Sequence, residues 1–219
     1  MIFEGIDQIR AIAWDFDGVL NRAGVAGKDG LYRWQHRMAE EFGVETAGLA
    51  RQVFGTDRRA MLTGKEDILD RIEHWVRDYK FEGDADDILE LWFDAETDLD
   101  DDLQRVVSQM DAAGLTQVIA TNNEARRARY IMNEAGMQDV VDGVFASGEM
   151  GVMKPDAAFF IQIEEALGLD PAEILLIDDL ERNTDAADKR GWLTWHYQPG
   201  GAMALVQAIM PLLLRAEGA

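Results

Sequence analysis

Two patterns of apolar residues divide the chain. Residues 10–14 form a short apolar run that stops abruptly at Asp15, as a buried strand entering a loop does. Beyond a glycine-spaced stretch, apolar residues recur at helical spacing, and no strand pattern interrupts them. The sequence therefore predicts a strand and then an all-helical insertion of about 70 residues, with helices at residues 31–42, 49–54, 68–79 and 88–93.

Helices and strands alternate after the acidic stretch of residues 94–102. The strands predicted there are nearly continuous in apolar residues, which is typical of a parallel sheet covered by helices on both faces. We expect an α/β fold, a doubly wound parallel sheet built from residues 1–21 and 95–219, with a small all-helical cap domain inserted at residues 22–94. The predicted strands are 117–121, 144–146, 174–177 and 193–195, and the helices are 103–114, 124–135, 156–167 and 203–213.

Polar residues of a distinctive kind stand where the predicted strands end. Ligands of such sheets bind beyond the carboxyl ends of the strands, so we expect these residues to converge at one edge of the sheet. They are Asp15-Phe16-Asp17 after the first strand, Thr121-Asn122-Asn123 after the second, Asp178-Asp179 after a later one, and Lys154-Pro155-Asp156 at the start of the helix before that later strand.

A cluster of three or four carboxylates at one site requires a cation, because like charges a few ångströms apart raise one another's pKa strongly. Magnesium prefers oxygen ligands and is commonly held by one or two carboxylates together with a substrate phosphate. The sequence has no clustered His, which argues against zinc, and no Cys at all. The absence of cysteine also excludes disulfides and a cysteine nucleophile.

The charge of the chain limits its partners. The chain carries 21 Lys and Arg against 42 Asp and Glu, a formal net charge of -21, and this charge repels polyanions over long range. We therefore expect no nucleic-acid partner, and an anionic substrate would need a local cation. The chain shows no secretory signal and no apolar run of membrane-spanning length, so we expect a cytoplasmic protein that does not bind membranes.

The four motifs, taken in order, resemble those of the haloacid dehalogenase (HAD) superfamily, most of whose members are phosphatases. The resemblance covers nearly the whole chain. Segments 147–156 and 177–183 look like the branch that contains bacterial sugar-1-phosphate phosphatases and the phosphatase domain of soluble epoxide hydrolase. The resemblance implies a Rossmann-like core, with the inserted helices closing over the site and setting substrate choice.

By motif position, the resemblance makes Asp15 the nucleophile that forms an aspartyl-phosphate, and also a ligand of Mg²⁺. Asp17 becomes the general acid and base, with its backbone carbonyl on the metal. Asp179 becomes the direct side-chain ligand, whereas Asp178 acts through water or orients Lys154. Lys154 itself would balance the charge of Asp15 and of the transferring phosphoryl group.

The phosphate would be bound by the hydroxyl of Thr121, helped by Asn122 and by backbone amides around Phe16 and Gly18. Each motif also has a structural interpretation when it is taken alone. Asp17-Gly18 is a common turn, Thr-Asn and Asp-Asp often cap helices, and a lone lysine is usually solvated. In the cap, the substrate-contact candidates are Arg22, Arg33, His36, Arg37, Arg58 and Arg59, although a solvated helix face explains most such charges.

The resulting hypothesis is a magnesium-dependent phosphohydrolase that acts on a small phosphorylated metabolite, as a monomer or homodimer. A 2-haloacid dehalogenase resembles this fold and uses the same nucleophile, but it needs neither magnesium nor Asp17. A sugar phosphomutase differs mainly in whether the cap admits water or sugar. A catalytically silent phosphate-binding protein is the non-enzyme alternative, since a fold does not guarantee activity.

Overall fold

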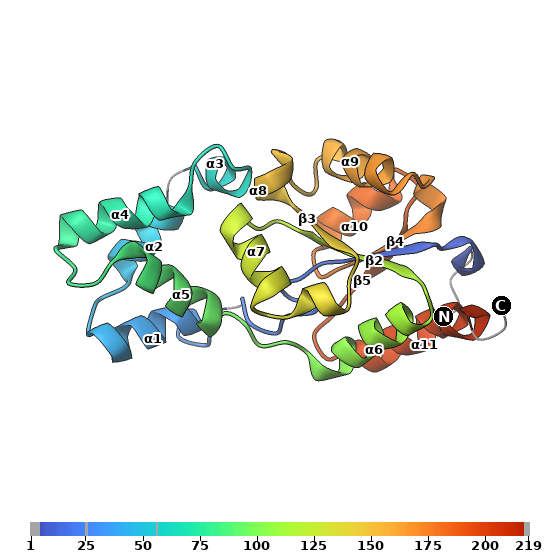
Figure 1. Ribbon diagram of the computed structural model, residues 1–219, viewed down its shortest axis with the longest axis horizontal. Coiled ribbons are helices and arrows are strands. Elements are labelled where there is room, and N and C mark those ends of the chain that lie inside the picture. The colour runs from blue at the N-terminus through green and yellow to red at the C-terminus, as the bar shows by residue number, and fades with distance from the viewer. Residues whose placement is uncertain (1–4, 25, 56, 217–219) are drawn as a thin grey trace.

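A computed structural model describes residues 5–24, 26–55 and 57–216 of the chain. A five-stranded sheet with strand order β3-β2-β1-β4-β5 lies at its centre, and every pair of neighbouring strands is parallel. Figure 1 shows helices on both sides of this sheet and a separate group of helices beside it. The strands are β1 (Ala11–Trp14), β2 (Thr116–Thr121), β3 (Gly143–Ala146), β4 (Ile174–Asp178) and β5 (Leu193–His196).

Alternate residues of the central strands face opposite sides of the sheet. Ile12 and Trp14 of β1 pack into one apolar core, and Ala13 packs into another on the opposite face. The first core takes side chains mainly from α6 (Asp101–Ala112), α7 (Ala125–Asn133) and α11 (Ala202–Ala216). The second takes them from α9 (Ala157–Leu167) and α10 (Glu181–Asp188). Burial on both faces explains why the strands are apolar throughout, and the predicted doubly wound α/β sheet is confirmed.

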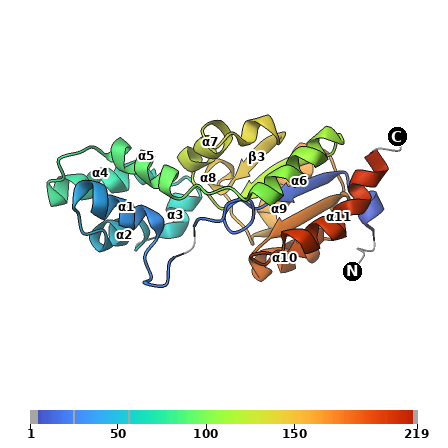
Figure 2. The ribbon, with the colours of Figure 1, turned by 90° about the horizontal axis from the view of Figure 1, so that it is seen from below.

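The inserted helices have an apolar core of their own. This core is built around Trp34, Leu49, Ile72, Trp75 and Ile88, all of which are buried. Figure 2 shows the helices as a unit at one end of the sheet, and we call α1–α5 and their connecting loops the cap. They are α1 (Arg33–Phe42), α2 (Ala47–Phe54), α3 (Arg58–Leu62), α4 (Ile68–Tyr79) and α5 (Ala85–Ala95).

The domain limits of 1–21 with 95–219 and of 22–94 stay a prediction. Residues 1–4 and 217–219 of the expected core, and residues 25 and 56 of the expected cap, lie outside the described part of the chain.

The sequence pattern located the long elements and missed two short helices. α3 spans only five residues and α10 carries few apolar side chains, so neither presents a recognisable helical stripe. Three short 3₁₀ helices and the four-residue α8 were also not predicted: Ile6–Gln8, Met137–Asp139, Pro171–Glu173 and Ser147–Met150.

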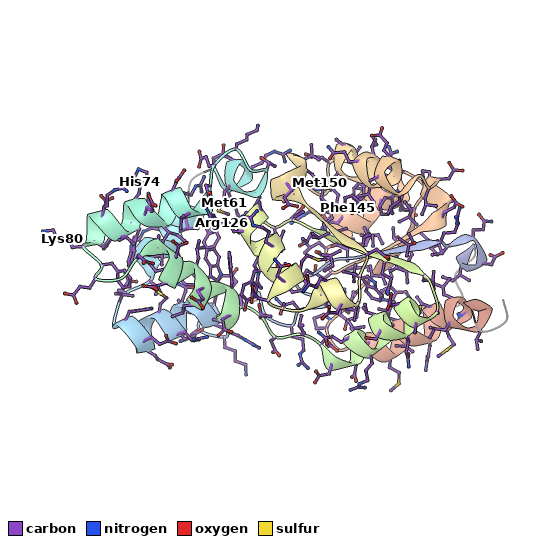
Figure 3. All side chains as sticks on the ribbon, viewed as in Figure 1. Met61, His74, Lys80, Arg126, Phe145 and Met150 are labelled. Carbon is purple, nitrogen blue, oxygen red and sulfur yellow. The ribbon has the colours of Figure 1, made fainter. Side chains whose placement is uncertain are left out.

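The cap touches the core beside α7 and α8. Gly64 of the cap lies so close to the core that a Cβ there would stand 2.2 Å from the carbonyl oxygen of Gly148. Arg126 of α7 donates to Asp67 at the start of α4 at 2.8 Å, and Arg59 pairs with Asp156. Figure 3 places Arg126 where the cap faces the core. The cap is therefore in contact with the loops that follow β2 and β3.

The helices of the described ranges 5–24, 26–55 and 57–216 all fall short of the length and apolar character needed to cross a lipid bilayer.

Candidate active site

Asp15 lies at the centre of the site because β1 is the central strand. Its backbone N–H donates to the carbonyl of Ile177 on β4 at 2.8 Å, which fixes the residue just beyond the end of β1. One carboxylate oxygen, Oδ1, accepts from the N–H of Phe16 at 2.7 Å. The other, Oδ2, lies 3.0 Å from Nζ of Lys154. With β2 on one side and β4 on the other, Asp15 borders both remaining strand-end motifs.

Lys154 is buried, which contradicts its structural interpretation as a solvated surface lysine. Its Nζ lies 2.6 Å from Asp178, 3.0 Å from Asp15 and 2.6 Å from the carbonyl oxygen of Ala120. An ammonium group has three hydrogens to donate, so these three acceptors saturate it. Burial alone would lower the pKa of Lys154, but the adjacent carboxylates outweigh it and raise the pKa above its ordinary value. The lysine is therefore a fixed positive charge inside the core.

The hydrogen-bond donors to the Asp178 side chain belong to the core. Besides Lys154, it accepts from Asn183 at 3.0 and 3.1 Å and from the backbone N–H of Leu180 at 2.9 Å. Burial favours a higher pKa for Asp178, but Lys154 and these hydrogen bonds outweigh it and lower the pKa below its ordinary value. Asp178 is thus hydrogen-bonded to Lys154, and its expected role of orienting that lysine stays a prediction. Asn183 braces Asp178, and the N-cap of α10 is Leu180 instead.

The geometry of the acidic residues fits a divalent cation. Oxygens of Asp15, Asp178 and Asp179 lie within 4.8 Å of one another, and Lys154 provides only one positive charge against three carboxylates. Burial, followed by the charge of Asp178, raises the pKa of Asp179, and burial raises that of Asp15 well above its ordinary value. The group thus lacks positive charge and offers only hard oxygen donors, which are the ligands that Mg²⁺ takes.

Gly18 has a different role from the one expected of it. Its N–H donates to the carbonyl of Asn21 at 2.9 Å, and the N–H of Phe16 donates to Asp15, so both amides have partners within the loop. At φ +86°, however, a Cβ on Gly18 would stand 2.4 Å from Oδ2 of Asp179. Glycine is needed here because the loop after β1 approaches the Asp179 carboxylate at close range.

Asp17 lies outside the group of three carboxylates and is held from two sides. Its Oδ1 accepts from the side-chain amide of Asn21 at 2.8 Å, and its Oδ2 accepts from that of Asn123 at 2.9 Å. The side chain is only partly buried, unlike that of Asp15, and Gly24 lies against it, since a Cβ there would be 3.3 Å from Oδ1. A carboxylate that is only partly buried can exchange protons with water or with a ligand.

Thr121, the last residue of β2, and Asn122, the first residue after it, have different hydrogen-bond partners. Thr121 is buried, and its hydroxyl oxygen accepts from Asn123 at 2.8 Å. The Asn122 side chain instead exchanges two hydrogen bonds with the backbone of Lys154, at 2.8 and 2.9 Å. Asn122 therefore holds the loop that carries Lys154, and Asn123 links Thr121 to Asp17.

Sequence reasoning missed Asn21 as part of the site, and it placed Asn123 at the strand end without giving it a role. Asn123 follows Thr121-Asn122 directly, so its place at the strand end was a usable signal. Asn21 lies four residues after Asp17, in a loop whose path no local pattern predicts.

The six cap candidates for substrate contact all have partners on the protein. Arg22 and Arg33 bind Asp98, and Arg37 binds Glu41 and Asp94. His36 lies against Asp29, Arg59 pairs with Asp156, and Arg58 lies over the ring of Phe54. These contacts favour the interpretation of a charged surface. Figure 3 places His74 at the outer side of the cap.

Sequence comparison relates the chain to a known family. The family described as haloacid dehalogenase-like hydrolase matches residues 9–189. Phosphatase MT3486 of Mycobacterium tuberculosis (strain CDC 1551 / Oshkosh) is 32% identical over 80 residues, which are 36% of this chain and 37% of that protein. The match thus spans little more than a third of that relative's length.

Solved structures share the fold. A HAD family enzyme from Bacteroides thetaiotaomicron, in complex with magnesium and inorganic phosphate, has a TM-score of 0.67 at 16% identity, over 88% of this chain and 96% of that one. L-2-haloacid dehalogenase from Xanthobacter autotrophicus has a TM-score of 0.60 at 19% identity, over 94% and 86%. At such identities the likeness concerns the fold alone, so the chemistry must be argued from the site.

Proposed function

The chain belongs to the haloacid dehalogenase-like hydrolase family, and we propose that it is a magnesium-dependent phosphatase of small phosphorylated metabolites that works through an aspartyl-phosphate on Asp15. The observation that carries this proposal is the environment of Asp15. A buried carboxylate lies 3.0 Å from a lysine ammonium and shares a site with two further carboxylates. The phosphatase name of the M. tuberculosis relative and the magnesium and phosphate bound by the B. thetaiotaomicron enzyme support the same class of reaction.

In the first step, a carboxylate oxygen of Asp15 bonds to phosphorus as the bond from phosphorus to the ester oxygen breaks. Asp17 gives its proton to that ester oxygen, which leaves as an alcohol. In the second step, Asp17 takes a proton from water as the water oxygen bonds to phosphorus. The bond from phosphorus to Asp15 then breaks, and inorganic phosphate leaves with both carboxylates restored to their starting states.

The other residues bind and orient. Lys154 places a fixed positive charge beside Asp15, and the hydroxyl of Thr121 donates to a phosphate oxygen. Asp15 and Asp179 would hold Mg²⁺ together with the backbone carbonyl of Asp17, while Asp178 orients Lys154. When bound, the cation neutralises charge on the phosphoryl oxygens. These local positive groups answer the objection that the net charge of -21 repels an anionic substrate.

Asp17 favours this reaction over the dehalogenase alternative. Dehalogenation at Asp15 needs no group to protonate an ester oxygen. The Asp17 carboxylate is nevertheless held in place by the side-chain amides of Asn21 and Asn123. A phosphomutase would use the same residues and differs in the acceptor of the phosphoryl group. The silent phosphate-binding alternative requires a broken catalytic set, whereas Asp15, Asp17 and Lys154 are all present.

The test is phosphate release from 4-nitrophenyl phosphate, with magnesium and with EDTA. We expect magnesium-dependent release that falls on the order of 10³-fold or more in Asp15→Asn, while the exposed-site control Asp188→Asn keeps wild-type activity. Release that persists in both EDTA and Asp15→Asn contradicts the mechanism. Chloride release from a 2-haloacid without metal would support the dehalogenase instead.

A further inference from the structure

Asn21 is a fully buried amide in the first of the two chain segments that join the core to the cap. Its Nδ2 donates to Oδ1 of Asp17 at 2.8 Å and to the carbonyl of Glu96 at 2.8 Å. Its Oδ1 accepts from the N–H of Asp98 at 2.8 Å and from that of Ala23 at 3.3 Å. All four hydrogen-bonding positions of the amide are used. Exchange of its O and N would leave oxygen facing two acceptors, so the orientation of the side chain is fixed.

The partners of Asn21 belong to three parts of the molecule. Asp17 is in the site, Ala23 is in the first connecting segment, and Glu96 and Asp98 are in the second. The two segments also bond directly, from the N–H of Arg22 to the carbonyl of Asp98 at 2.8 Å. Asn21 is therefore the side chain through which the Asp17 carboxylate contacts both connections to the cap.

Glu96 extends this connection into the cap. Its buried carboxylate accepts from the N–H of Trp34, in the first turn of α1, at 3.0 Å and from that of Gly24 at 2.8 Å. On the opposite side, Asn123 donates to Asp17 and to Thr121. A series of hydrogen-bonded residues thus runs from Trp34 of α1 through Glu96, Asn21, Asp17 and Asn123 to Thr121, the residue expected to bind phosphate. Within Glu96 it passes from the side chain to the backbone carbonyl.

Arg127, a residue of the core, hydrogen-bonds to the cap end of this series. This buried residue of α7 donates to the carbonyls of Phe93 and Glu96, each at 2.7 Å, at the end of α5. Its guanidinium also lies over the ring of Phe16, 5.8 Å from the centroid. The carbonyl of Glu96 therefore has a defined position relative to the site, and that carbonyl is one of the two acceptors of Asn21.

We propose that Asn21 is a positioning residue. It sets the position of the Asp17 carboxylate, and that position depends on the position of the second segment that connects core and cap. The proposal rests on the phosphatase function proposed above. A displacement of residues 96–98 with the cap removes two of the four partners of Asn21 and frees its amide to release Asp17. Asp17 then takes up its proton-donating position only when the cap lies where residues 96–98 can hydrogen-bond to Asn21.

Leaving groups of different basicity separate a positioning role from a general loss of structure. An alkoxide leaving group needs a proton from Asp17 as the ester bond breaks, whereas 2,4-dinitrophenolate is a stable anion and needs none. A misplaced Asp17 therefore slows the first step, which kcat/KM reports, selectively for alkyl and phenyl phosphates. Its loss as a base in the second step lowers kcat for every ester alike. A partly unfolded enzyme loses the same fraction of its rate on every ester.

The experiment compares kcat/KM of wild type and Asn21→Leu on phenyl phosphate and 2,4-dinitrophenyl phosphate, because kcat/KM reports transfer of the phosphoryl group to Asp15 and not the later attack of water. Gln117→Leu is the matched control, because Gln117 is likewise a fully buried amide, bonded to Trp14 and to the carbonyl of Val107, and it lies at the beginning of β2. We expect Asn21→Leu to lower kcat/KM on phenyl phosphate by about 10²-fold and on 2,4-dinitrophenyl phosphate by less than about 3-fold, within the range that general acid catalysis contributes. Gln117→Leu should change both rates by the same factor.

A second variant tests the link to the cap and stays informative if Asn21→Leu does not fold. Glu96→Gln alters the contacts to Trp34 and Gly24 without touching Asp17, and we expect the same selective loss in kcat/KM, about 10-fold on phenyl phosphate. Equal losses on both esters in both variants overturn the positioning role. A selective loss in Asn21→Leu with none in Glu96→Gln overturns the dependence on the cap. A wild-type enzyme inactive on every ester instead overturns the proposed function, and this inference with it.

Discussion

The two halves of the site are held in different ways. On one side, Lys154 and Asp178 are buried, and their partners Asn183, Leu180 and Ala120 all belong to the core. On the other side, Asp17 is only partly buried, and one of its two amide partners, Asn21, is bonded to both connections between core and cap. The electrostatic half is thus built into the core, whereas the proton-transfer half depends on the position of the cap.

This difference follows from what each half has to do. A charge that stabilises a phosphoryl group acts best when it is fixed beforehand and kept from water. In the proposed reaction, a proton donor and acceptor must serve first the leaving group and then water, and a cap that moves would control the access of both. We infer that substitutions in the first half act mainly on stability and metal binding, and that substitutions in the second act mainly on leaving-group dependence.

The largest effect on stability is expected from Lys154→Met, which removes the cation that pairs with Asp15 and Asp178. Removal of the ammonium leaves the carboxylates of Asp15 and Asp178 buried without their cationic partner. We expect the free energy of unfolding to fall by about 3–5 kcal/mol, as measured by urea denaturation in EDTA, together with loss of activity. The control Lys189→Met removes an exposed lysine and should change stability little. A loss below about 1 kcal/mol for Lys154→Met would show that the ion pairs do not hold the core half together.

A smaller effect on stability, with a large one on metal affinity, is expected from Gly18→Ala. The new Cβ would stand 2.4 Å from Oδ2 of Asp179 and force that carboxylate to move. The magnesium concentration for half-maximal activity should rise by about 10-fold or more, and the strained backbone should cost about 1–2 kcal/mol.

Gly168→Ala is the matched control for this substitution. Its φ is also positive, at +63°, but a Cβ there meets nothing within 4 Å. It should therefore show the backbone cost without the change in metal affinity. Equal magnesium dependence of the two variants would contradict a role for Gly18 in making room for Asp179.

The smallest effect is expected where the cap touches the core through Asp67 and Arg126. Hydrogen bonding from Arg126 lowers the pKa of Asp67 below its ordinary value of 3.8. Because the folded-state pKa is the lower one, the ionised carboxylate stabilises the folded protein above the ordinary pKa, and this contribution is lost as pH falls through the folded pKa. Asp67→Asn should therefore lower stability by about 0.2–1 kcal/mol at pH values near 7 and 5, since the pair is partly exposed.

Urea denaturation of wild type and Asp67→Asn checks this expectation, with measurements at about pH 7, 5 and 3. The difference between the two proteins should shrink only at the most acidic value. A difference that grows on acidification would give the wrong sign for this ion pair.

The elements of the fold differ in how well the sequence predicted them. The long helices and all five strands were predictable, because each has a continuous or periodic apolar pattern set by the face it buries. The meeting of Asp15, Lys154 and Asp178 was predictable too, since parallel strands bring their carboxyl ends to one edge. The burial of Arg127 had no such signal, because α7 reads as a polar helix and contacts with the distant end of α5 and with Phe16 bury that side chain.

The strand-end chemistry can be read from the amino-acid order: which residues carry carboxylates, which carries the ammonium, and the order that brings them to one edge of a parallel sheet. Contacts between distant segments are what hold Asp17, require glycine at position 18 and make Asn122 support the loop of Lys154. Asn21 and Glu96 are 75 residues apart, and their contact depends on how two connecting segments pass each other. Local periodicity reports which face of an element is buried, but it carries no information on the hydrogen-bond partners that distant segments supply.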